Sequence, residues 1–174
     1  MNHMKSLIAL AILVTAPLSA ANDTNPGTPF CFGTVETCPC GNGFGLEMGC
    51  ANSTCSGATL SGSGTASISA NDLTLTAVGL TPGPGLFFQG DARVNRGIGS
   101  AFGDGLRCAG GEIKRLEIRF SEAAQASTTV SIAERGEVQI GDTKRYQYWY
   151  RDPNVWLCDN GFNLTNGYEV TWTL

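Results

Sequence analysis

The chain has 174 residues, of which only 15% are charged, and its net charge is −4. Its one histidine, His3, lies in the N-terminal segment described next, so residues 22–174 contain none. The lack of imidazole there excludes Ser-His-Asp and Cys-His catalysis and every zinc site built on histidine. No basic run is present, which argues against nucleic acid as a partner.

Residues 1–21 predict a cleaved signal peptide. Lys5 supplies the positive charge, the apolar run extends from Leu7 to Leu18, and Ser19-Ala20-Ala21 offers small residues for cleavage. A retained membrane anchor is the alternative, but the run is too short to span a bilayer comfortably. No later apolar stretch approaches transmembrane length. We therefore expect a secreted, extracellular protein without stable membrane insertion.

Residues 22–29 predict a flexible leader, and residues 30–56 predict a cross-linked segment that forms one domain with the rest of the chain. Five of the seven cysteines fall in this second segment, which has little apolar content of its own. In an exported chain such cysteines form disulfides. A zinc knot is the alternative, but the spacing lacks the two separated C-x2-C pairs that zinc clusters usually show.

The remaining two cysteines, Cys108 and Cys158, stand apart from the cluster, and we expect them to pair with each other. Cys55 is then the predicted free thiol. Two more bridges would form within the remaining set of Cys31, Cys38, Cys40 and Cys50.

Residues 57–174 predict a β-sandwich made of about eight short strands, with a jelly roll as one candidate topology. Residues 72–78 alternate apolar and polar side chains, and 86–89 form a short apolar run after a Pro-Gly turn. Residues 93–107 predict a Gly-rich loop. Residues 112–120 predict a strand with a bulge near Lys114, in which Leu116, Ile118 and Phe120 share one face.

Two further short strands are predicted on either side of residues 134–136, from Val130 to Ile132 and from Val138 to Ile140. An aromatic strand follows over 145–151. Its parity places three tyrosines on one face, and the other face carries arginines, a glutamine and a tryptophan. A final strand alternates at Tyr168, Val170 and Trp172.

Several motifs together resemble an uncharacterised secreted bacterial module rich in cysteine, and the similarity covers nearly all of residues 30–172. No established activity, cofactor or catalytic residue follows from this resemblance. The position of Cys55 is usually glycine in such modules, which implies that this thiol is the extra one. The motifs are Phe30-Cys-Phe-Gly, Cys38-Pro-Cys-Gly-Asn, Gly49-Cys-Ala-Asn-Ser, Leu86-Phe-Phe-Gln-Gly, Phe102-Gly-Asp-Gly-Leu-Arg-Cys-Ala-Gly-Gly, Tyr146-Gln-Tyr-Trp-Tyr-Arg-Asp-Pro and Gly161-Phe-Asn-Leu-Thr-Asn.

The predicted function is non-catalytic binding, adhesion or assembly outside the cell, with a polysaccharide or a cell-envelope surface as the candidate partner. Sugar rings stack on exposed aromatic side chains, and neighbouring polar groups direct hydrogen bonds to them. The predicted glycan site consists of Trp149, Tyr150, Arg151, Trp156 and Asn160. The alternative is that these aromatic residues belong to the core.

A carbohydrate-active enzyme is the main alternative, because glycoside hydrolysis needs only two carboxylates. A purely structural building block is another. No cofactor or metal is expected, although oxygen ligands in Gly-rich turns at Asp104, Asp159 and Asn160 leave a structural calcium open. The candidate catalytic carboxylates are Asp104, Asp152, Asp159, Glu112 and Glu117, all of which also fit turns or solvated strand faces.

Overall fold

The fold is an all-β sandwich. It is known from a computed structural model, which describes residues 25–154 and 158–174. Its larger sheet has six strands: β1, β13, β11, β4 and β9 lie side by side in that order, and β12 also pairs with β11. These strands are β1 (Thr28–Phe30), β4 (Pro84–Gly90), β9 (Lys114–Phe120), β11 (Thr143–Arg151), β12 (Phe162–Leu164) and β13 (Gly167–Thr171).

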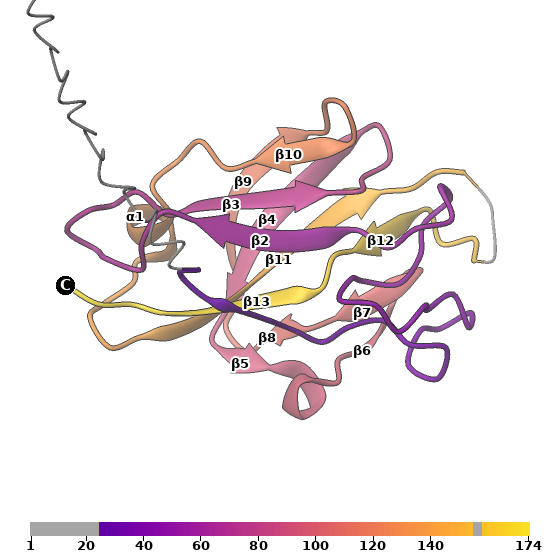
Figure 1. Cartoon of the computed structure of the whole chain (residues 1–174), viewed down its shortest axis with the longest axis horizontal. Helices are drawn as coiled ribbons and strands as arrows, with labels where there is room; N and C mark the ends of the chain where they lie inside the picture. Colours follow the sequence, from indigo (N-terminus) through magenta and orange to yellow (C-terminus); the bar gives the residue numbers. More distant parts are fainter. Residues whose placement is uncertain (1–24, 155–157) are drawn as a thin grey trace, which may run out of the picture.

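The second sheet has three strands in the order β10-β3-β2 and lies over one face of the larger sheet (Figure 1). Two short antiparallel pairs, β5 with β8 and β6 with β7, lie on the opposite side. A 3-10 turn and a one-turn helix complete the fold. The bounds are β2 (Thr59–Ser63), β3 (Thr74–Val78), β5 (Ala92–Arg93), η1 (Val94–Gly97), β6 (Ser100–Phe102), β7 (Gly105–Arg107), β8 (Ala109–Gly110), β10 (Gln125–Ser127) and α1 (Ile132–Gly136).

The main core fills the space between the two sheets, and the aromatic strand β11 supplies its centre. The parity prediction is confirmed there: Tyr146, Tyr148 and Tyr150 are all buried against the three-stranded sheet. Buried tyrosines need partners for their hydroxyl groups. Tyr148 donates to the Arg119 carbonyl at 2.8 Å, and the Trp172 indole donates to the Tyr146 hydroxyl at 2.9 Å.

Three local predictions in the sandwich are wrong. Residues 93–107, which were expected to form a loop, contain η1 and the β6–β7 hairpin. The chain forms helix α1 where a pair of strands was expected, because the Ser131 hydroxyl accepts from the Glu134 N–H and caps a turn whose Ile132 is buried. The bulge in β9 lies at Leu116, two residues beyond the predicted position. Leu116 therefore turns into the core, whereas Ile118 faces outward.

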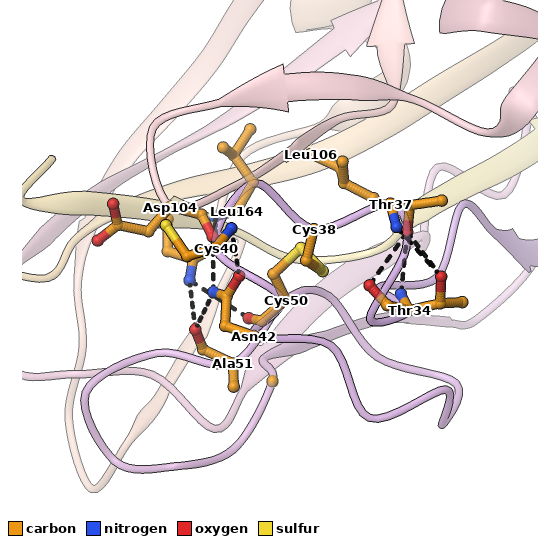
Figure 2. The surroundings of a disulfide bond; sticks show 12 residues. Thr34, Thr37, Cys38, Cys40, Asn42, Cys50, Ala51, Asp104, Leu106 and Leu164 are labelled. Carbon is orange, nitrogen blue, oxygen red and sulfur yellow. Dashed lines mark hydrogen bonds between the residues drawn. A yellow bond between two sulfur atoms is a disulfide. The ribbon is translucent and has the colours of Figure 1, made fainter. Parts of the chain in front are cut away.

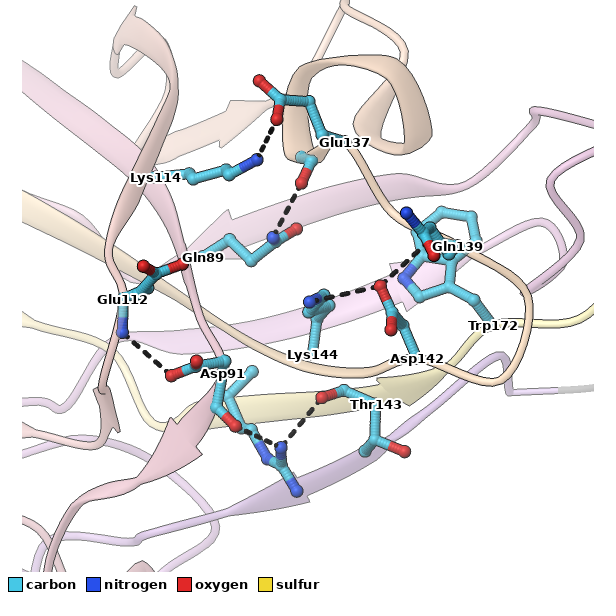
Figure 3. Close-up of polar contacts among 12 residues, drawn as sticks. Gln89, Asp91, Glu112, Lys114, Glu137, Gln139, Asp142, Thr143, Lys144 and Trp172 are labelled. Atoms are coloured by element: carbon cyan, nitrogen blue, oxygen red, sulfur yellow. Dashed lines mark hydrogen bonds and ion pairs between the residues drawn. The ribbon is translucent and has the colours of Figure 1, made fainter.

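Polar contacts hold α1 against the end of β4 and β9 (Figure 3). The Gln89 amide donates to the Gly136 carbonyl at 3.0 Å, and Lys114, the first residue of β9, pairs with Glu137 at 2.6 Å. These contacts fix one end of the edge strand β9.

The three disulfides are Cys31–Cys108, Cys38–Cys50 and Cys40–Cys158. The predicted Cys108–Cys158 bridge is wrong, and only one bridge, Cys38–Cys50, lies within the cluster. The other two instead tie the Cys-rich segment to the sandwich. Cys55 is free and exposed, as predicted.

An amide network reinforces the attachment of the Cys-rich segment. Next to Cys38–Cys50, Asn42 donates from its amide to the carbonyls of Ala51 and Asp104 at 2.8 and 2.9 Å (Figure 2). The segment thereby packs on the outer side of the sandwich, beside β7.

Candidate functional site

A groove of about 610 Å³ opens on the outer face of the larger sheet, the face away from the main core. Its lining comes from β4, β6, β7, β9, β11 and β12 and from the turn before β9. We call it the outer groove. It is lined by Pro84, Gly85, Leu86, Phe88, Phe102, Arg107, Ile113, Arg115, Ile118, Trp149 and Leu164.

The floor of the outer groove is a row of apolar side chains that crosses four strands. Leu164 of β12 pairs with Trp149 of β11, Trp149 pairs with Leu86 of β4, and Leu86 pairs with Ile118 of β9. Residues directly opposite one another on antiparallel strands project from the same face. The row ends at Ile118, which is 69% exposed because β9 is the edge strand.

One wall of the groove is the β6–β7 hairpin, which carries Phe102 and Arg107. Its turn needs Gly103, whose φ is +62° and where a Cβ atom would lie 2.3 Å from the Phe162 ring. This close approach lets Phe102 pack edge-on against Phe162 at 5.2 Å between ring centroids. The Gln147 amide, which projects from β11, holds the hairpin by donating to the Leu106 carbonyl at 2.7 Å.

The charge around the groove is positive, although the chain as a whole is acidic. Arg107 and Arg115 belong to the lining, which contains no carboxylate. A third guanidinium, that of Arg151, lies over the Trp149 ring at 5.4 Å from its centroid, within the range of a cation–π contact. The groove therefore combines an apolar floor with basic groups.

The one carboxylate of β9, Glu117, is paired with the core residue Phe87 and projects from the face opposite the groove, where the protein already holds it. It accepts from the Thr129 N–H at 2.8 Å and from the Thr129 hydroxyl at 2.6 Å. Burial raises the pKa of Glu117, but the hydrogen bonds from Thr129 and Val130 and the nearby Arg119 guanidinium together outweigh that effect, so the pKa lies below its ordinary value. Glu117 is therefore charged at neutral pH and is bound to the loop that precedes α1.

Of the predicted glycan-binding residues, the structure brings only Trp149 and Arg151 to the groove. Tyr150 is a correction, because it points into the main core, where its hydroxyl accepts from the Asn52 amide at 3.1 Å. Asn160 is exposed but lies outside the groove lining and donates to Asp104 at 2.7 Å. Trp156 lies outside the described residues.

The candidate catalytic carboxylates serve separate local networks. Asp152 is buried and accepts from the Ser53 N–H at 2.8 Å and from the Ser53 hydroxyl, which holds the turn after Asn52. Asp104 accepts from the N–H and the amide of Asn160. Each of these two carboxylates therefore stabilises a turn of its own.

The other two candidate carboxylates, Glu112 and Asp159, are exposed. Within residues 25–154 and 158–174, no group of three or more metal-binding side chains is placed to hold an ion. The described carboxylates thus do not converge on one site.

Sequence reasoning missed most of the groove. The short apolar run at Leu86 does not by itself indicate an exposed groove, and the alternation over residues 112–120 predicts Ile118 on the same face as Leu116. Phe102 and Arg107 belonged to the predicted Gly-rich loop. One signal was available, since Trp149 was predicted on the face opposite the tyrosines. That face is the floor of the groove.

No family model matches the chain, and neither a curated protein nor a solved structure matches it. Among the described residues, no helix is long and apolar enough to cross a membrane. Three disulfides indicate an oxidising, extracellular environment.

Proposed function

We propose that this protein is a secreted, non-catalytic binding module that takes a segment of another extracellular protein into its outer groove. The observation that carries the proposal is the composition of the groove. Its floor is apolar and partly exposed, arginines surround it, and its lining has no carboxylate. Such a site suits a ligand with apolar side chains and negative charges.

A polysaccharide fits this groove less well than a peptide does. Ile113, Ile118, Leu86 and Leu164 give the lining an aliphatic character, whereas sugar hydroxyls need many polar partners. The Trp149 ring is also contacted by the Arg151 guanidinium and by Phe162. A sugar ring that stacked on Trp149 would compete with these contacts. Glycan binding is therefore the competing hypothesis, and the experiment described below distinguishes it from peptide binding.

An enzymatic role has weaker support. Glycoside hydrolysis requires two carboxylates on either side of one bond. Asp104, Asp152 and Glu117 instead accept hydrogen bonds from three different turns or loops. None of them lines the outer groove.

Selection from a random peptide library tests the proposal. The disulfide-bonded protein would be immobilised and compared with the variant Ile118→Asp, which places a negative charge in the exposed end of the floor. We expect the wild type to enrich peptides that contain apolar and acidic residues. Affinity for the enriched peptides should fall by about tenfold or more in Ile118→Asp, measured by isothermal titration calorimetry.

The matched control is Ile140→Asp, because Ile140 has a similar exposure of 62% and lies outside the groove. This variant should bind the same peptides as tightly as the wild type. The proposal is wrong if the wild type enriches no peptide over Ile118→Asp. If soluble polysaccharides instead retard the wild type in affinity electrophoresis and do not retard Trp149→Ala, the ligand of the groove is a glycan and not a peptide.

A further inference from the structure

We infer that the partner segment binds as an extended strand along the free edge of β9, so that it adds a seventh strand to the larger sheet. Its outward side chains would then cover the outer groove. This inference rests on the proposed function and specifies how the partner is held. Strand addition is a general mode of peptide recognition, in which backbone hydrogen bonds give affinity and side-chain pockets give specificity.

The edge of β9 is long and unpaired. β9 has seven residues and pairs with β4 alone. Among the described residues, the single hydrogen bond to its backbone from outside β4 is the one that the Tyr148 hydroxyl donates to the Arg119 carbonyl. The loop before α1 and α1 itself contact β9 through the Glu117 and Lys114 side chains. An edge strand of this kind presents a row of free N–H and C=O groups to another chain. The opposite edge, β1, has only three residues.

The outer groove reaches this edge. Arg115 and Ile118 of β9 line it, and Ile113 lines it just before the strand begins. A strand added beside β9 would lie about 4.8 Å away and would project every second side chain onto the groove side. Those side chains would cover Ile118 and Phe120, which are now 69% and 66% exposed. Two large apolar side chains exposed on an edge strand are thus explained as a contact surface.

The charge of β9 selects an acidic partner. The strand carries three basic residues and one acidic residue, and three of these four charges already have partners. Lys114 pairs with Glu137, and Glu117 accepts from Thr129 and pairs with Arg119 at 3.7 Å. Arg115 faces the groove without an acidic residue in the lining. Opposite charges on facing strands stabilise a sheet. The partner strand should therefore alternate apolar and acidic residues.

A second copy of this chain fits the edge poorly. Two copies related by a twofold axis would pair their β9 strands antiparallel. If all seven residues pair, the axis passes through the middle residue, Glu117. Glu117 would then face its own copy, and Arg115 would face Arg119. Like charges directly opposite one another destabilise a sheet. Basic residues and a bulge also protect an edge from indiscriminate pairing, so these features favour one class of partner over self-association.

The test uses a peptide selected by the wild-type protein, about ten residues long so that it can span β9 at about 3.3 Å per residue. Each backbone N–H of the peptide is methylated in turn. In an added antiparallel strand, alternate residues direct their N–H groups toward the neighbouring strand. We expect methylation at residues of one parity to weaken binding by about tenfold, whereas methylation at the other parity has little effect.

A second measurement tests the charge at the edge. Arg115→Glu should weaken binding of an acidic peptide by about tenfold. The control Arg135→Glu, at an exposed position on α1, should leave binding unchanged. Hydrogen exchange of the β9 amides should slow when the peptide is added.

The outcomes separate the two proposals. If peptides bind and lose affinity in Ile118→Asp, but every methylated peptide binds equally well, the groove is a docking site without strand addition. The further inference then fails and the proposed function stands. If no peptide is selected over Ile118→Asp, both fail together.

Discussion

Gln147 is the buried polar residue on which the outer groove depends. It projects from β11 toward the short outer strands, and its amide is completely buried. Its Oε1 accepts from the backbone N–H groups of Cys108 and Ala109, and its Nε2 donates to the carbonyls of Leu106 and Thr165. One side chain thus satisfies four backbone groups that ladder hydrogen bonds leave unpaired.

We expect Gln147→Leu to lower the free energy of unfolding by about 3 kcal/mol or more, since a buried backbone group without a partner costs about 1–3 kcal/mol. Urea unfolding followed by tryptophan fluorescence would measure the loss. The same variant should weaken peptide binding, because Phe102 and Arg107 lie on the hairpin that Gln147 holds.

The matched control is Gln139→Leu, at an exposed position. Its free energy of unfolding should stay within about 0.5 kcal/mol of the wild type. If Gln147→Leu and the wild type unfold at the same urea concentration, the Gln147 amide does not stabilise the hairpin.

The alternation of residues along a strand predicted which face some side chains occupy, but it failed where the strand contains a bulge. The alternation of β11 correctly directed Tyr148 inward and Trp149 outward, since a regular strand has a period of two. In β9 the extra residue at Leu116 breaks that period, so Leu116 and Ile118 face opposite sides. The exposed end of the groove was therefore not predictable from spacing.

At the scale of elements, the disulfides attach a segment with little core of its own. Cys31–Cys108 closes a separation of 77 residues, whereas Cys38–Cys50 closes only 12. In the chain-entropy model the stabilisation grows with loop length, to about 4.5 kcal/mol for the longer loop and about 3 kcal/mol for the shorter. Of these two bridges, Cys31–Cys108 should therefore contribute more stability than the local Cys38–Cys50.

We expect the double substitution of Cys31→Ala and Cys108→Ala to destabilise the protein by about 1.5 kcal/mol more than that of Cys38→Ala and Cys50→Ala. Thermal unfolding of both variants, followed by circular dichroism, would measure the difference. A non-reducing peptide map of the wild type must first show the three bridges and a free Cys55. A larger loss from the Cys38 and Cys50 pair would contradict the expected ranking.

The pairing could not be predicted from cysteine spacing. A bridge depends on which elements meet in space, and Cys108 lies between β7 and β8, next to Cys31 rather than Cys158. The strands around α1 were mispredicted for a related reason. A Ser131 cap and one turn of helix bury Ile132, whereas Ile140, which the predicted strands also included, is 62% exposed.

At the scale of the whole molecule, the fold class followed from strand alternation and turn residues, whereas the site did not. The groove forms between a hairpin at residues 100–107 and strands that begin at residues 84, 114, 143 and 162. No local pattern brings these segments together. Their meeting depends on the order of strands in the larger sheet, which a single sequence does not specify.

The core between the sheets contains four buried tyrosines, Tyr146, Tyr148, Tyr150 and Tyr168. Burial raises the pKa of each hydroxyl above its ordinary value of 10.0, and that of Tyr148 reaches about 12. Ionisation would place a negative charge inside the core at Tyr146 and Tyr150 and at its edge at Tyr148 and Tyr168. A tyrosinate is less stable in these surroundings than in water. The four tyrosines thus make the free energy of unfolding depend on pH in the alkaline range.

We expect the sandwich to lose stability as the pH rises from 10 toward 12, because the unfolded chain releases tyrosine protons that the folded chain retains. Below pH 10 both states keep these protons, and stability is independent of the tyrosines. Above it, each tyrosine lowers the free energy of unfolding by at most about 1.4 kcal/mol per pH unit. Tyrosinate absorbance and near-ultraviolet circular dichroism should change together. Tyr148→Phe should reduce the slope, because it removes one of the protons that only the unfolded chain releases. Tyrosinate formation while the fold persists would contradict the coupling.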